Sequence, residues 1–174
     1  MPVLSRPGPS DYPPYYQRYL DLVPEGDILQ LLAEQRVATC EMLQDMDDER
    51  AGYRYGPGKW SIKETVGHLV DTERVFAFRA LWFARNDPSA LPGFEQNDWV
   101  IQADFDTRRW SELVSECRAV REASLNLFHG IPAEAWDRRG EAAGNAFAVR
   151  AIPFIIAGHE AHHMNVLREK YLKI

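Results

Sequence analysis

The sequence predicts an all-α protein, a four-helix bundle with one long crossover connection and an N-terminal arm rich in tyrosine and proline. The first observation is that apolar residues recur at helical spacing in four long stretches, whereas no stretch shows a convincing strand pattern. These stretches are about 27–46, 61–85, 106–129 and 148–172. The second is the link 86–106, which is long enough, at about 20 residues, to return along the bundle. Its neighbouring helices therefore need not be antiparallel.

The arm, residues 1–25, contains six prolines, which exclude a long helix there. It also contains Tyr12, Tyr15, Tyr16 and Tyr19, which make it too apolar for a disordered tail. We expect these rings to hold an extended arm, with a short helical turn, against the body of the protein. The rest of the chain, 26–174, is expected to form one bundle domain.

The ends of the expected helices carry recognisable signals. Asp27 is a plausible N-cap, and Ser61 with Glu64 forms a capping box at the start of the second helix. Gly130 stands where the third helix should end. Pro153 leaves two interpretations of the last helix: either the helix begins near this proline, or the proline bends it.

Composition narrows the class of protein. A chain of 174 residues with 45% apolar and 26% charged residues is typical of one soluble globular domain. The net charge of −6 argues against a nucleic-acid partner. No run of 18 apolar residues and no signal pattern is present, so we expect no membrane association and a cytoplasmic location. Cys40 and Cys117 fall inside helical patterns and are expected to be core residues.

Three of the five histidines lie in the segment Gly158–His163. In a helix, His159 and His163 would share one face, close enough to bind the same metal ion. The segment also matches His-Glu-x-x-His, in which Glu160 would be a candidate general base. However, the short tail after it supplies no downstream ligand of the protease type. Glu160 lies about 100° around the helix from His159, so an ordinary helix carboxylate is the alternative.

A third ligand must come from upstream, where the candidates are His68 and His129. His129 falls in the last turn of the third helix, where capping exposed carbonyls is the simpler role. His68 lies in the middle of the second helix and can complete a three-histidine site with an open fourth position. His162 is expected beside the site or at the surface. The alternative is a solvated histidine pair that binds no metal.

Three side chains lie on the same flank of the second helix as His68: Thr72, Arg79 and Trp82. They are candidates to line a substrate or cofactor pocket. Bundle packing and surface positions are the alternative.

Several linked motifs resemble the DinB-like superfamily. They are the segments 55–64, 67–74 and 158–168, together with the tyrosine-rich arm and the loop 94–100. The resemblance implies an up-down-down-up bundle that holds a divalent metal, nickel or zinc, on three histidines. By motif these are His68, His159 and His163, which leaves His129 and His162 outside the site.

The resemblance also implies a function. Characterised relatives include transferases and isomerases that use low-molecular-weight thiols such as bacillithiol or mycothiol. We therefore expect a metal-dependent enzyme, a thiol-dependent S-transferase or a hydrolase, which acts on a small molecule and forms a homodimer. With a metal-bound thiolate as the nucleophile, no protein cysteine would be needed. The alternative is a non-catalytic, metal-stabilised stress-response or interaction module.

Overall fold

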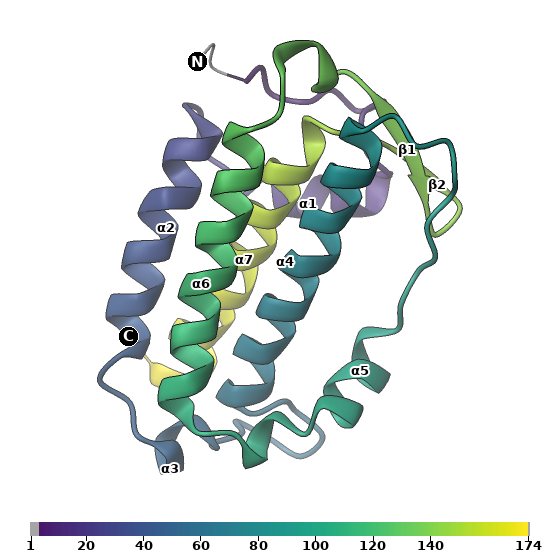
Figure 1. Ribbon diagram of the computed structural model, residues 1–174. Helices are drawn as coiled ribbons and strands as arrows, with labels where there is room; N and C mark the ends of the chain where they lie inside the picture. Colours follow the sequence, from purple (N-terminus) through teal and green to yellow (C-terminus); the bar gives the residue numbers. More distant parts are fainter. Residues whose placement is uncertain (1–3, 174) are drawn as a thin grey trace.

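A computed structural model describes residues 4–173, and most of this chain is helical (Figure 1). The bundle consists of α2 (Ile28–Leu43), α4 (Ile62–Ala84), α6 (Trp110–His129) and α7 (Ala151–Val166). The shorter helices are α1 (Gln17–Leu20), α3 (Asp48–Ala51) and α5 (Gln96–Ala103), with 3₁₀ turns η1 (Pro14–Tyr16), η2 (Phe105–Thr107) and η3 (Ala133–Ala135). The strands are β1 (Arg139–Ala142) and β2 (Asn145–Ala148), and α7 continues into the π-helical segment η4 (Leu167–Leu172).

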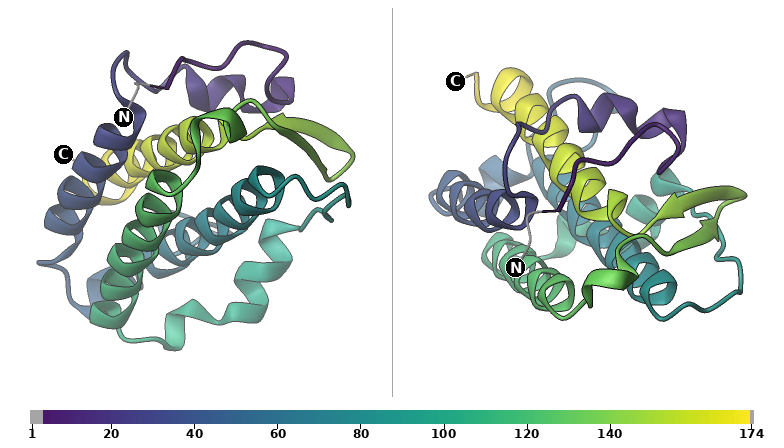
Figure 2. Two further views of the ribbon diagram at one scale, coloured as in Figure 1. Left: turned by 45° about the horizontal axis from the view of Figure 1, so that its top comes forward. Right: turned by 90° about the horizontal axis from the view of Figure 1, so that it is seen from above.

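The direction of the helices follows from the long connection between α4 and α6. In Figure 1, α4 and α6 both run upwards, whereas α2 and α7 run downwards. Both α2 and α4 pack against α6 and α7, as the view along the bundle in Figure 2 also shows. The chain after α4 descends outside the bundle through α5 before α6 begins at the lower end. None of the helices within residues 4–173 combines the length and the hydropathy of a membrane-spanning segment.

The predicted helix starts are largely confirmed. The Asp27 carboxylate accepts a hydrogen bond from the Leu29 backbone N–H at 2.9 Å and caps α2. Ser61 and Glu64 form the capping box of α4, in which each side chain accepts the other's backbone N–H. Pro153 is the third residue of α7, so the helix begins just before it. Proline has no backbone N–H, and an N–H in the first turn of a helix would have no intrahelical acceptor, so Pro153 costs α7 no hydrogen bond.

Two clusters of apolar side chains form the core, one towards each end of the bundle. The upper cluster includes Phe76, Phe83, Phe128 and Ile152. The lower cluster includes Leu43, Ile62, Val66, Leu113 and Met164. Along α4 and α7, the residues between the two clusters are largely polar, and the candidate site lies there.

The expectation that the chain lacks strands is wrong. β1 and β2 form an antiparallel hairpin in which Ala142 pairs with Asn145. Ala143 and Gly144 make its turn with positive φ angles of 52° and 71°, as two-residue hairpin turns require. These strands of four residues are mostly small or polar, so they carry no alternating apolar pattern. The crossover connection joins this hairpin, because the Leu91 N–H donates to the Glu141 carbonyl at 2.9 Å.

The N-terminal arm packs on the bundle. Tyr12 and Tyr19 are buried, and α1 lies against α7 (Figure 2). This approach is close: a Cβ atom added at Gly158 would lie 2.1 Å from the Tyr19 carbonyl oxygen. Only glycine at that position allows α1 to lie on α7.

Candidate metal centre

The structure brings His68 of α4 together with His159 and His163 of α7. One ring nitrogen from each histidine lies within 4.8 Å of the others. The Nε2 atoms of His68 and His159 are 3.1 Å apart. His68 and His159 are buried, and His163 is half-buried.

Neighbouring side chains fix the orientation of these rings. The Thr72 hydroxyl lies 3.3 Å from Nδ1 of His68; by accepting the Nδ1–H, it would leave Nε2 free to bind a metal. The Trp60 ring lies 4.8 Å from that of His68 and stacks at 6.4 Å on that of His163. Tyr19 packs edge-on against His159 at 5.3 Å. The sequence identified Thr72 but not Trp60 or Tyr19, which lie outside the helix that carries His68.

Burial makes these histidines poor bases. It lowers the pKa of His68 to about 4 and that of His163 to about 3. The pKa of His159 also lies well below its ordinary value, because of burial and then the charges of His163 and His68. All three rings are therefore neutral at pH 7, the form that binds a metal ion.

The donor set fits a divalent metal. Nitrogen ligands about 2.0–2.1 Å from a tetrahedral zinc ion stand roughly 3.3–3.4 Å apart. The observed separation of 3.1 Å between two Nε2 atoms is close to that value, and the ligand nitrogens of all three histidines lie within 4.8 Å of one another. Three imidazoles suit zinc or nickel and leave a coordination position open.

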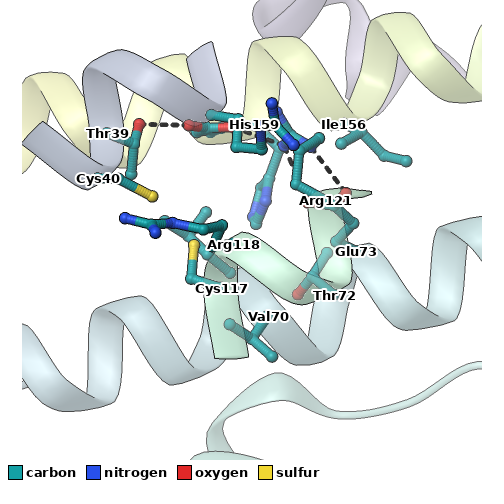
Figure 3. A pocket seen from close by; sticks show the side chains of 13 residues that line it. Thr39, Cys40, Val70, Thr72, Glu73, Cys117, Arg118, Arg121, Ile156 and His159 are labelled. Carbon is teal, nitrogen blue, oxygen red and sulfur yellow. Dashed lines mark hydrogen bonds and ion pairs between the residues drawn. The ribbon is translucent and has the colours of Figure 1, made fainter. Parts of the chain in front are cut away.

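A buried ion-pair network lies beside His159 (Figure 3). Arg121 of α6 donates two hydrogen bonds of 2.8 Å to the Glu73 carboxylate and a third, of 2.5 Å, to Glu160. The other oxygen of Glu160 accepts from the Thr39 hydroxyl at 2.5 Å. Both carboxylate oxygens of Glu160, the candidate general base, thus take part in this network.

Sequence reasoning gave Arg121 and Glu73 no role in this network. The signal available was a charged residue on an apolar stripe, since Arg121 follows Cys117 and precedes Leu125 by four residues each. A small cavity of about 20 Å³, room for roughly one water molecule, lies beside the network and is lined by both cysteines. Burial raises the pKa of Cys117 to about 12, which makes its thiol a poor nucleophile at neutral pH.

Comparison with known proteins identifies the family. Residues 31–167 match the model of the DinB superfamily. The chain belongs to this superfamily. A protein of Oceanobacillus iheyensis named "Putative metal-dependent hydrolase OB0413" is 25% identical over 126 residues, which are 71% of this chain and 72% of that protein. A second, from Geobacillus thermodenitrificans and named "Putative metal-dependent hydrolase", is 30% identical over 59 residues, 34% of this chain and 33% of that protein.

Solved structures show the same fold as this DinB-superfamily chain. YfiT from Bacillus subtilis, described as having an unusual four-helix bundle topology, gives a TM-score of 0.64 at 13% identity over 95% of this chain and 92% of its own. The mycothiol-dependent maleylpyruvate isomerase gives 0.67, also at 13% identity, over 83% of this chain and 61% of its own. The expected four-helix bundle fold is thereby supported.

His129 and His162, the other histidines of this DinB-superfamily chain, lie outside the group formed by His68, His159 and His163. His129 ends α6 and is exposed. His162 is half-buried, and its ring lies 5.6 Å from that of Tyr19 and 5.1 Å from that of His163, but it is not one of the three histidines whose ring nitrogens gather within 4.8 Å of one another.

A cavity of about 270 Å³ opens onto His68 and His159. Its walls come from five parts of the chain: the arm, α4, the crossover connection, the β-hairpin and α7, which contributes His159. The residues other than the two histidines are Tyr15, Tyr16, Tyr19, Thr72, Phe76, Arg79, Gly93, Phe94, Glu95, Gln96 and Ala143. Of the three pocket candidates, Thr72 and Arg79 thus line this cavity. Trp82 does not line it; its indole N–H donates to the Ser89 carbonyl at 3.1 Å.

Proposed function

We propose that this protein is a metal-dependent enzyme that acts on a small molecule, with a divalent ion, nickel or zinc, held by His68, His159 and His163. One observation carries the proposal: three neutral histidine rings converge beside a cavity of about 270 Å³. Structural metal sites are closed by four protein ligands, whereas catalytic ones keep a position for water or substrate. The adjoining cavity therefore favours an enzyme over a non-catalytic, metal-stabilised module.

The roles of the neighbouring residues follow from their contacts. Thr72 orients His68, while Trp60 and Tyr19 cover the rings and limit the access of water. When bound, the ion would supply Lewis acidity and lower the pKa of a water or thiol at the open position. The arm and the crossover connection would enclose the substrate in the cavity.

Two reaction classes fit this site: hydrolysis, and transfer to a low-molecular-weight thiol. The names of the sequence relatives support the first, and the mycothiol-dependent isomerase with the same fold supports the second. In either class the nucleophile comes from outside the protein, which agrees with the unreactive state of Cys117.

Metal binding is the first test. Protein purified without a histidine tag, stripped of metal and titrated with Zn²⁺ and with Ni²⁺, should take up one equivalent of one of these ions per chain. His68→Ala should abolish this uptake and keep the circular dichroism spectrum, whereas His129→Ala should bind as the wild type does. Absence of uptake by the wild type would refute the proposal.

Activity is the second test. The metal-loaded protein should be assayed against ester and amide substrates, and against electrophilic substrates with and without an added thiol. Turnover that disappears in His68→Ala and does not need a thiol indicates a hydrolase. Turnover that requires the thiol indicates a transferase.

A further inference from the structure

Among the residues that the structure describes, Arg79 is a buried cation without a carboxylate partner. It lies in α4 with 3% of its surface exposed, and its Nε atom has no hydrogen-bond partner in the described chain. Nη2 lies 3.4 Å from the Pro92 carbonyl, at the long limit for a hydrogen bond. The guanidinium otherwise lies over the rings of Phe76 and Phe147, at 5.0 and 5.7 Å from their centroids.

The other buried cations differ from Arg79. Among residues 4–173, the buried basic side chains other than histidine are Lys63, Arg79 and Arg121. Lys63 binds Asp48 at 2.5 Å, and Arg121 binds two carboxylates. A buried charge without a counter-charge costs free energy that the fold must offset elsewhere. An external anion that bound beside Arg79 would therefore stabilise its buried charge.

The guanidinium and the histidines share one cavity. Arg79, His68 and His159 all line the space of about 270 Å³. Arg79 follows His68 by eleven residues, which places both on one side of α4, with their Cα atoms about 16 Å apart along the helix. Both side chains reach into the space between, which is wide enough for a small organic molecule.

The carboxylate that lines this cavity does not neutralise Arg79. Glu95 is exposed, and its Oε1 accepts hydrogen bonds of 3.1 Å from the Asn97 backbone and side chain. The polar group that faces the guanidinium is the Tyr16 hydroxyl, which is uncharged at neutral pH because the pKa of tyrosine is ordinarily about 10 and burial raises it further. Aromatic rings form much of the remaining wall, which suits an apolar or planar body behind a charged group.

We propose that Arg79 binds an oxyanion group, a carboxylate or a phosphate, of the small-molecule substrate and so directs the rest of that molecule towards the three histidines. The direction of the substrate towards the histidines rests on the proposed function, whereas the binding of an oxyanion by Arg79 does not. An arginine presents a planar fork of N–H donors that matches either oxyanion. The substrate class is therefore a small organic anion with its reactive atom several bonds away from the charge.

The test measures anion binding directly. Isothermal titration calorimetry on the full chain, in metal-loaded and metal-free forms, would use benzoate and inorganic phosphate as the two oxyanion probes. Benzamide is the neutral counterpart of benzoate. Arg79→Gln removes the charge, Arg79→Lys keeps it without the fork, and Arg85→Gln is the control, because Arg85 is an exposed arginine at the end of the same helix.

We expect at least one probe to bind the wild type and the Arg85→Gln variant alike. Arg79→Gln should weaken that binding at least about tenfold, as expected for a lost hydrogen bond to a charged group. Benzamide should bind more weakly than benzoate. Failure of both probes to bind at millimolar concentration, or equal binding by Arg79→Gln, would overturn the proposal.

Two further readouts separate the possible failures. Loss of anion binding in Arg79→Gln that also occurs without metal supports the anion site even if the histidines hold no ion. Metal uptake with no dependence of anion binding on Arg79 refutes this inference and leaves the proposed function standing. A purely structural Arg79 would make Arg79→Gln unfold at lower denaturant concentration, whereas a binding residue buried at a cost predicts equal or greater stability without ligand.

Discussion

The Nε2 atoms of His68 and His159 lie 3.1 Å apart, although 91 positions separate the two residues in the chain. Their meeting depends on the register of two antiparallel helices. The capping box at Ser61 and Glu64 fixes where α4 begins, and therefore which face His68 presents to α7. The apolar clusters above and below then hold the two helices in this register.

The Thr72 hydroxyl is expected to position His68 for metal binding. Thr72→Val removes the group that lies 3.3 Å from Nδ1 and leaves a side chain of similar volume. Loss of such an outer contact typically weakens metal binding about 10–100-fold. Competition with a chelating dye would measure the change in Kd for Zn²⁺. Thr39→Val is the matched control, because it deletes a buried hydroxyl that contacts Glu160 instead of a histidine; equal Kd values for both variants would contradict this role of Thr72.

The sequence identified the parts of the fold and site that depend on local spacing. The four-residue interval between His159 and His163, and the Ser61–Glu64 capping signal, are properties of one helix and can be read without knowing the fold. The positions of the two residues, His68 in the middle of a helix and His129 at the end of one, favoured His68 as the third ligand, and the family resemblance agreed with this choice. Which helices face each other cannot be read from local spacing.

The hairpin and the ion pairs could not be predicted in the same way. β1 and β2 are short and poor in large apolar residues, and their pairing is completed by Leu91 from a distant segment. Arg121 joins Glu73 and Glu160 across three helices. Such contacts depend on tertiary packing. In the sequence, their one sign is a charged residue, Arg121, on an otherwise apolar helical stripe.

Gly158 is expected to be essential for the docking of the arm. In most helix interiors, replacing glycine by alanine stabilises a protein by about 1 kcal/mol. Here the new Cβ would lie 2.1 Å from the Tyr19 carbonyl oxygen, which belongs to the backbone. We expect Gly158→Ala to lower the free energy of unfolding by roughly 1–3 kcal/mol, as overpacking does. Urea denaturation would measure this, with Gly130→Ala as a control whose Cβ would meet nothing closer than 3.4 Å. A stabilised Gly158→Ala would show that the arm does not lie on α7.

Asp11 is expected to make arm attachment pH-dependent. It is buried and accepts hydrogen bonds from the Gly8 N–H at 2.9 Å and Arg150 at 3.0 Å. Burial alone would raise the pKa of this carboxyl, but the hydrogen bonds from Gly8 and Arg150 and the charges of Arg150 and Arg139 outweigh it, so the pKa lies below the ordinary 3.8. The stabilisation of the folded protein by the Asp11 carboxylate is therefore fully present above the unfolded-state pKa of 3.8. It is lost as the pH falls through the lower pKa that Asp11 has in the folded protein.

Asp11→Asn should therefore destabilise the protein by roughly 1.5–3 kcal/mol at pH 7, the range for hydrogen bonds to charged groups. The difference from the wild type should shrink as the pH falls below 3.8, because the wild-type carboxyl is then protonated as well. Denaturation curves between pH 7 and the acid limit of folding would measure it. Asp21→Asn changes an exposed carboxylate of the same arm and should have little effect. A difference independent of pH would mean that the Asp11 charge contributes nothing.

Arg121 should be the most sensitive position of the buried network. Arg121→Met leaves the carboxylates of Glu73 and Glu160 buried without a counter-charge, which typically costs about 3–5 kcal/mol. Replacing the whole set, with Arg121→Met, Glu73→Leu and Glu160→Leu together, removes the unpaired charges and should restore most of the lost stability. Guanidinium denaturation of both variants would test this, with Arg118→Met as the control because Arg118 is exposed on the same helix.

If the triple variant also retained wild-type metal uptake, Glu160 would have no role in metal binding. A triple variant less stable than Arg121→Met would instead show that the network stabilises the bundle by more than charge compensation.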